Sequence, residues 1–186
     1  MISLDKANTK DSNRYRQSSI WVDGVEYEIK TPFPYWIAFG NKIKDYKSID
    51  EFNPIYKDSI PANKEAGLLE LFKFFIDDQP LPRNMGDELN IEIIDWIIDS
   101  EYIYAAFLSQ YNIDLELEDI HWHKFRSLFK SLKGHVINDI MSYRTWIEPK
   151  VYKDEKKKQK AENEEHNLRK QRWELRKEKI KLFEMK

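Results

Sequence analysis

The sequence contains no cysteine, which excludes a disulfide framework, a thiol nucleophile and a thiolate metal site, and which fits a reducing cytosol. Glycine is scarce too, with five residues at positions 24, 40, 67, 86 and 134. So few glycines cannot build a phosphate-binding loop, and no Gly-x-Ser-x-Gly nucleophile elbow is present. Apolar runs are short and interrupted by charge, whereas a membrane-spanning helix needs roughly 18 to 20 apolar residues. The N-terminal residues also lack the apolar core of a signal peptide.

Charge is distributed unevenly along the 186 residues. Residues 150–186 contain 14 Lys and Arg and 8 Asp and Glu, a net +6, whereas residues 1–149 contain 17 and 25, a net −8. The total of −2 provides no global basic field for nucleic acid. Length and charge together predict three parts. These are a disordered N-terminal extension (1–19), a helical domain with an N-terminal hairpin (20–149) and a charged C-terminal helical arm (150–186).

Residues 20–29 predict a β-hairpin. Two β-prone runs flank Asp23 and Gly24, which tolerate the positive φ angles of a type I′ turn. The second run, residues 25–29, alternates apolar and charged side chains, which predicts one buried face. Because an isolated hairpin is only marginally stable in water, we expect this one to pack on helices.

The rest of the chain predicts a mainly α fold of six or seven helices that ends in a long charged helix. The expected helices are one bearing Trp36, a short one within residues 48–60, one opening at Pro61, a buried one at Ile91–Ile98 for which a strand stays open, one N-capped by Asp99, one bearing Trp122 that stops at Gly134, and one before Pro149. The core-facing stripe expected on the Pro61 helix is Leu68, Leu71, Phe72, Phe75 and Ile76. The expected buried cluster is Trp36, Phe39, Phe72, Phe75, Phe107, Trp122, Phe125 and Phe129.

The C-terminal arm favours helix throughout and allows three interpretations. It could be a solvated charged helix, a partner-docking helix, or a nucleic-acid arm, although interleaved glutamates would repel phosphates. The solvated helix is the first interpretation, and docking comes second because the arm contains apolar residues that a purely solvated helix would not need. The candidate partner-binding residues are Leu168, Trp173, Leu175, Ile180 and Phe183.

Two histidines are the most metal-like feature of the sequence. On a helix, residues two positions apart point about 200° apart, so His121 and His123 cannot easily bind the same ion. We interpret His121 as half-buried and His123 as exposed. Acidic pairs such as Asp77-Asp78 lack the spacing of a calcium loop and are interpreted as carboxylates at helix ends. We therefore expect no catalytic residue, no metal site and no cofactor, and thus a protein that is not an enzyme.

Four segments then appear in a recognisable order: Tyr102–Phe107, Tyr111–Leu115, His121–Arg126 and Ile140–Arg144. With the hairpin before them and the charged tail after them, these segments resemble a family of phage and prophage proteins from Gram-positive bacteria. That family is encoded among tail morphogenesis genes near the tape measure gene. It usually has an aromatic residue where His123 stands, which indicates that position 123 is not catalytic.

The resemblance implies a tail assembly chaperone of the host bacterial cytoplasm. Its partners would be the tape measure protein and, as a second partner, the tail tube protein. A tape measure protein is a long helix former that exposes apolar surface until tube subunits surround it. A helical protein with an amphipathic arm could cover that surface reversibly. No membrane partner is expected, and homo-oligomerisation stays open.

Two alternatives remain at this point. The protein could be a permanent tail-completion component of the virion, which the sequence does not distinguish from a chaperone. It could instead be a nucleic-acid-binding accessory protein that uses the basic arm, with binding that falls steeply as salt rises.

Overall fold

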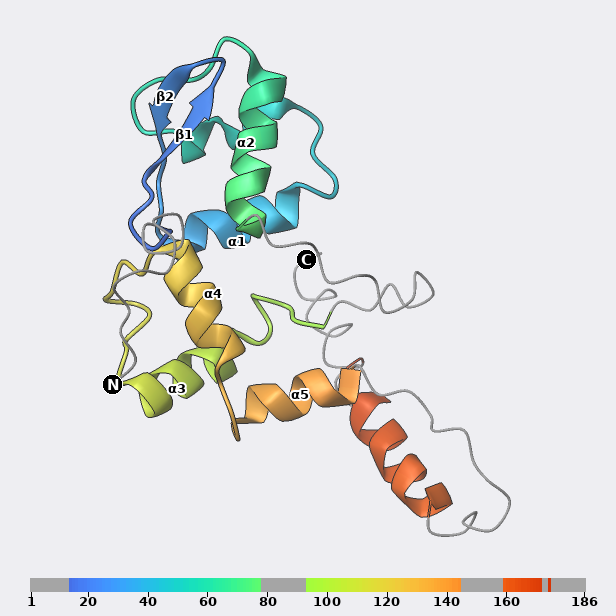
Figure 1. Ribbon diagram of the computed structural model, residues 1–186. Coiled ribbons are helices and arrows are strands. Elements are labelled where there is room, and N and C mark those ends of the chain that lie inside the picture. Colours follow the sequence, from blue (N-terminus) through green and yellow to red (C-terminus); the bar gives the residue numbers. More distant parts are fainter. Residues whose placement is uncertain (1–13, 78–92, 145–158, 172–173, 175–186) are drawn as a thin grey trace, which may run out of the picture. The chain divides into compact units, whose positions relative to one another are not determined.

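The computed structural model describes residues 14–77, 93–144, 159–171 and 174 (Figure 1). In chain order the elements are β1 (Ser19–Val22), β2 (Val25–Glu28), α1 (Phe33–Lys42), the 3₁₀ helix η1 (Ile49–Ile55), α2 (Lys64–Ile76), α3 (Ser100–Tyr111), α4 (Trp122–Lys130) and α5 (Val136–Arg144). A further helix covers residues 159–171. The expected mainly α fold with an N-terminal hairpin is confirmed. None of the described helices is long and apolar enough to cross a membrane.

The chain divides into two compact units. The first contains residues 1–85 and 115–131, and the second contains residues 86–114 and 132–186. The first unit therefore includes the hairpin, α1, η1, α2 and α4, and the second includes α3, α5 and the helix at 159–171. The predicted boundary near residue 149 lies outside the described residues.

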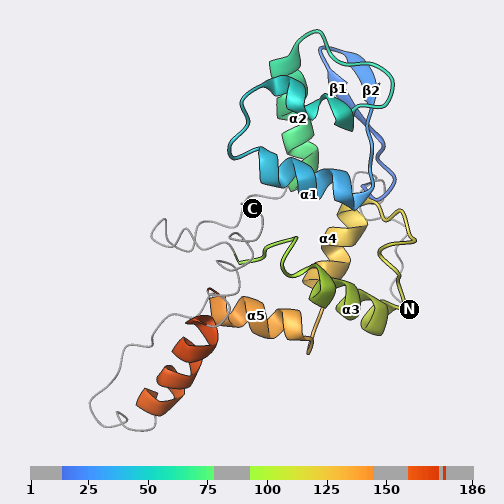
Figure 2. The same cartoon turned by 180° about the vertical axis from the view of Figure 1, so that it is seen from behind.

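The β-hairpin forms as the sequence predicts. Asp23 and Gly24 have φ angles of 51° and 79°, and the strands pair in the register Val22↔Val25. Ile20 and Val22 are buried, and β1 packs against α2, as both views of the fold show (Figures 1 and 2). The predicted buried face of β2 is realised only toward its end, because Val25 lies at the turn and is exposed.

Local signals set the ends of the helices in the first unit. Pro32 precedes α1, and η1 begins with a capping box in which Ser48 and Glu51 satisfy each other's backbone N–H groups. The helix expected to open at Pro61 begins three residues later, because the Asn63 side chain caps α2 by accepting from the N–H of Ala66.

The buried stripe of α2 differs from the predicted one. It consists of Gly67, Leu71 and Phe74. The expected stripe was rotated toward residues that prove to be only partly buried, namely Leu68, Phe72, Phe75 and Ile76. The reason is tertiary: Phe74 packs against the Trp36 ring with centroids 4.4 Å apart, and against His123 of α4 at 4.3 Å.

The predicted aromatic cluster is correct in part. Trp36, Phe39, Trp122 and Phe125 are buried in the first unit, whereas Phe72, Phe75 and Phe129 keep partial exposure there. Phe107 is fully buried too, but it belongs to the second unit. The predicted cluster is therefore divided between two cores.

A glycine allows η1 and α2 to approach closely. A Cβ atom on Gly67 would lie 2.6 Å from the hydroxyl of Tyr56 and 3.1 Å from Cγ of Pro61. Tyr56 cannot move aside easily, because it is buried and its ring packs edge-on against Tyr27 at 6.4 Å.

We therefore expect Gly67→Ala to destabilise the protein by about 1–3 kcal/mol through overpacking. At an ordinary helical site the same change would instead stabilise by about 0.5–1 kcal/mol. Urea denaturation of the single and double variants measures the effect. Tyr56→Phe removes the clashing oxygen, so the double variant should recover most of the loss. If the double variant loses as much stability as Gly67→Ala alone, this explanation is wrong.

In the second unit, α3 packs against α5. The buried helix expected at Ile91–Ile98 is wrong for the residues that can be assessed, because residues 93–99 form bends and turns. Residues 91 and 92 lie outside the described part of the chain. The turn is stabilised by Asp95, whose side chain accepts from the backbone N–H groups of Ile97 and Ile98.

Candidate functional site

Of the five predicted partner-binding residues, only Leu168 lies within the described part of the chain. It stands on the helix at 159–171 with 56% of its surface exposed. The other four, Trp173, Leu175, Ile180 and Phe183, lie outside the described residues. The structure thus leaves Leu168 available for contact.

This helix, which we call the arm helix (residues 159–171), contacts Tyr143 of α5 through polar and aromatic groups. The His166 ring meets the Tyr143 ring edge-on at 5.5 Å, and the Arg169 guanidinium lies 5.3 Å from its centroid. Arg169 also donates to the Tyr143 hydroxyl and pairs with Glu165. Such exposed contacts contribute little stability each, so attachment through Tyr143 is readily reversible.

His121 lies at the N-terminal end of α4, and His123 forms a hydrogen bond at the C-terminal end of α2. His121 is the N-cap of α4: its Nδ1 accepts the backbone N–H of His123 at 3.2 Å. Its Nε2 lies 2.8 Å from the carbonyl oxygen of Gln17, to which it donates. One acceptor and one donor suit a neutral imidazole. Burial, as the largest cause, accordingly lowers the pKa of His121.

We expect the first unit to lose stability as the pH falls below about 6.5, the ordinary pKa of histidine. Since the pKa of His121 is lowered in the folded state, the unfolded chain takes up the proton first, which favours unfolding in acid. His121→Asn keeps an N-cap acceptor without a titrating group. Urea midpoints at pH 5.5 and 7.5 should therefore show a smaller acid loss in this variant. An equal loss in both proteins would contradict the prediction.

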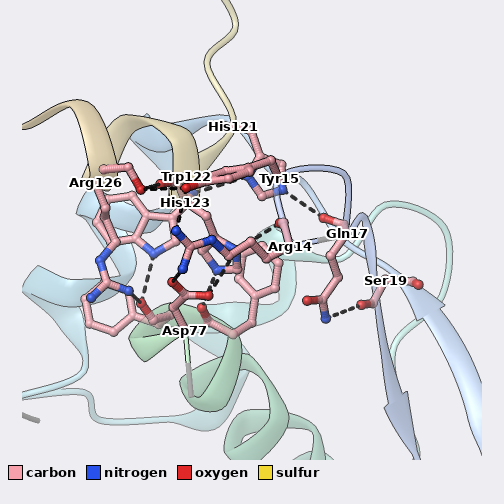
Figure 3. Close-up of polar contacts among 12 residues, drawn as sticks. Arg14, Tyr15, Gln17, Ser19, Asp77, His121, Trp122, His123 and Arg126 are labelled. Carbon is pink, nitrogen blue, oxygen red and sulfur yellow. Dashed lines mark hydrogen bonds and ion pairs between the residues drawn. The ribbon is translucent and has the colours of Figure 1, made fainter. Parts of the chain in front are cut away.

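His123 is not exposed, as the sequence had indicated, but buried, with 2% of its surface accessible. Its Nε2 lies 2.7 Å from the carbonyl oxygen of Phe74, and its Nδ1 lies 3.0 Å from that of Arg14 (Figure 3). The local sequence does not predict this burial, because the ring is covered by α2 and by residues far away in the chain.

The C-terminal end of α2 receives its missing hydrogen bonds from α4. Besides His123 at Phe74, the indole N–H of Trp122 and the guanidinium of Arg126 both donate to the carbonyl oxygen of Phe75, at 2.9 Å and 2.8 Å. Donors and positive charge are favourable at this end of a helix. These hydrogen bonds hold α4 against α2.

Asp77 ends α2 in the left-handed conformation, with φ of 62°. The sequence interpretation of Asp77 as a carboxylate favoured by a helix dipole is wrong, because it lies at the C-terminal end, where a negative charge is unfavourable. The cationic guanidinium of Arg14 compensates, because it lies 3.3 Å from the Asp77 carboxylate; Nδ1 of His123 lies 3.6 Å from the same carboxylate.

Residues 14–18, which we call the N-terminal strap, cross α4 and the end of α2. Besides the contacts of Arg14 and Gln17, Tyr15 lies within 3.2 Å of the Ser127 hydroxyl, and the Ser18 carbonyl accepts from the N–H of Ile29. This segment differs from the predicted disorder, because its hydrogen bonds to distant residues hold it in place. Residues 1–13 lie outside the described part of the chain.

The second unit contains a buried ion pair that the sequence does not predict. The carboxylate of Asp99 is fully buried and accepts from both terminal nitrogens of Arg144, one at 3.0 Å. Arg144 also donates to the Ile93 carbonyl at 2.9 Å. Asp99 does precede α3 as predicted, but its side chain makes no capping bond there. Within the described residues, no group of three or more acidic or histidine side chains is arranged to bind a metal ion.

These features describe a mainly α-helical protein, and comparison with known families assigns it to a class of bacteriophage proteins. A family model described as Bacteriophage Gp15 protein matches residues 17–170. The match covers most of the chain, which therefore belongs to this family. The matched range includes His121 and His123, the Asp99–Arg144 pair and most of the arm helix. The expectation of a bacteriophage protein family is thus confirmed. No curated protein and no solved structure matches the chain.

Proposed function

We propose that this protein is a tail assembly chaperone that binds the phage tape measure protein in the host cytoplasm, with no covalent chemistry. The observation that carries the proposal is membership in the Bacteriophage Gp15 protein family over residues 17–170. The resemblance to proteins encoded near the tape measure gene rests on segments within the same range.

The arm helix supports this proposal physically. It contacts Tyr143 through weak, exposed interactions, while Leu168 keeps more than half of its surface accessible. A helix held in this way can exchange its contacts with the protein for contacts with a partner helix at small cost. Several such weak contacts together retain a long partner, and polymerising tube subunits can displace them one at a time.

Co-expression with a tape measure fragment tests the proposal. The full chain should keep the fragment soluble, and a chain truncated after residue 149 should retain less of it. Leu168→Ser should weaken the effect, whereas Asn167→Ser, an exposed polar neighbour, is the matched control. If the full-length protein leaves the fragment insoluble, the proposal is wrong.

Family membership is equally compatible with a permanent tail component, and the two roles differ in their location after assembly. A chaperone should be absent from purified virions. A tail-completion protein should be present at a fixed copy number. Quantitative mass spectrometry of purified particles separates these outcomes, and stoichiometric recovery in the virion would replace the chaperone role with the structural one.

A further inference from the structure

We propose that the outer face of α3 binds an amphipathic helix of a partner protein, one whose apolar stripe is flanked by lysine or arginine. The outer face consists of Glu101, Ala105 and Leu108 of α3 together with Ile97 of the preceding turn, all within the second unit. The chaperone role was argued from the family and the arm helix. This inference does not rest on that role, and either can fail without the other.

The helix α3 carries apolar side chains on two opposite sides. Its inner side packs within its own unit, which includes α5, and the buried residues there are Ile103, Ala106 and Phe107. Glu101, Ala105 and Leu108 recur at i, i+4 and i+7, so they share the opposite side of the helix. All three are exposed, with 41% of the Leu108 surface accessible. A surface helix ordinarily presents polar residues on that side, so an apolar outer face indicates a contact still to be made.

The turn before α3 lengthens this face. The backbone N–H of Asp99 donates to the carbonyl of Asp95 at 2.9 Å, and a bond across four residues is that of a helical turn. Ile97 therefore lies about one turn before Glu101, and 68% of its surface is exposed. The outer face thus presents an aliphatic side chain toward each end, with Ala105 between them. A side chain as small as that of Ala105 allows a second helix to approach closely.

The charge of this region selects the chemistry of the partner. Residues 93–114 contain four acidic residues and no lysine or arginine. Asp99 is paired within the core, but Glu101 stands in the outer face itself, and Asp95 and Asp114 precede and follow α3. Negative charge beside an apolar stripe repels an acidic helix and favours one that carries lysine or arginine along its own stripe. The outer face is therefore complementary to a basic amphipathic helix.

Peptide binding by the full-length protein tests the proposal. The probe is a peptide of about 20 residues, long enough to form a helix, with leucines at helical spacing and only alanine and lysine elsewhere. It should bind at low salt and lose affinity as salt rises, because exposed charges are screened. A second peptide with glutamate in place of lysine should not bind. Equal binding of the two peptides, or no binding of the lysine peptide, would overturn the proposal.

Variants of the full-length protein locate the binding. Leu108→Ser should weaken binding of the lysine peptide about tenfold, because a leucine side chain no longer contributes its apolar contact. Leu69→Ser is the matched control, since it alters a leucine of similar exposure on α2 in the first unit. Glu101→Gln should lower both the affinity and its dependence on salt. If Leu69→Ser weakens binding as much as Leu108→Ser does, the peptide does not bind through α3 and the proposal is wrong.

The protein without peptide tests two other occupants of the outer face. A dimer in sedimentation that Leu108→Ser dissociates would mean that a second copy covers the face. Amide NMR signals of residues 172–186 that shift in Leu108→Ser would mean that the protein's own arm covers it. We expect neither, and either result would replace the partner helix proposed here.

Discussion

Asp99→Ala is expected to reduce the free energy of unfolding by about 3–5 kcal/mol, because it leaves the Arg144 guanidinium buried without a counter-charge. Asp99 is fully buried and Arg144 is 5% exposed, so water cannot replace the lost partner. The carboxylate also accepts the N–H of Asp95 at 2.9 Å, and that bond would be lost as well. Chemical denaturation followed by circular dichroism measures the loss.

Two comparison variants make this prediction specific. Replacing both partners, as Asp99→Leu with Arg144→Met, removes the unpaired charge and should recover most of the stability. Lys57→Ala breaks an exposed pair with Glu28 and should have little effect. If Asp99→Ala proves as mild as Lys57→Ala, the buried pair does not have the energetic role that its burial indicates.

Trp36→Ala should have an effect of similar size in the first unit, about 3–5 kcal/mol, because it leaves a large cavity in a packed core. The Trp36 ring has no accessible surface and packs against Phe39, Phe74 and Phe75. Its indole N–H donates to the carbonyl of Lys30 at 2.8 Å, which fixes α1 against the strand end. Thermal and urea unfolding should both show the loss.

The matched control is another tryptophan. Trp21 lies on the outer face of β1 with most of its surface exposed, so Trp21→Ala should change stability little. Trp36→Phe should retain much of the packing but lose the hydrogen bond to Lys30, which predicts an intermediate loss. Equal losses for Trp21→Ala and Trp36→Ala would place the core elsewhere.

Features that depend on neighbouring residues could be predicted from the sequence. The hairpin turn at Asp23 and Gly24 follows from the positive φ angles that these residues tolerate. The short helix within residues 48–60 appears as η1, with its capping box at Ser48. Composition and pattern likewise predicted the helical class. The chain is rich in helix formers, and its apolar residues recur at helical spacing.

Features that join distant residues could not be predicted in this way. The buried face of α2 is set by what packs on it, and an almost continuous apolar run such as residues 68–76 fits more than one face. His123 was expected to be exposed because its neighbours on the α4 helix are polar, but the strap and the end of α2 cover it.

The amino-acid sequence by itself therefore determined the helical class, the hairpin, several helix ends and the phage family, since each depends on local pattern or on motif order. Only the tertiary structure decided that Asp99 pairs with Arg144 and that His123 lies between two carbonyl groups. The physical reason is that a side chain's charge and hydrogen bonds depend on the groups that folding brings to it. In both cases the decisive partner lies more than 40 residues away in the chain.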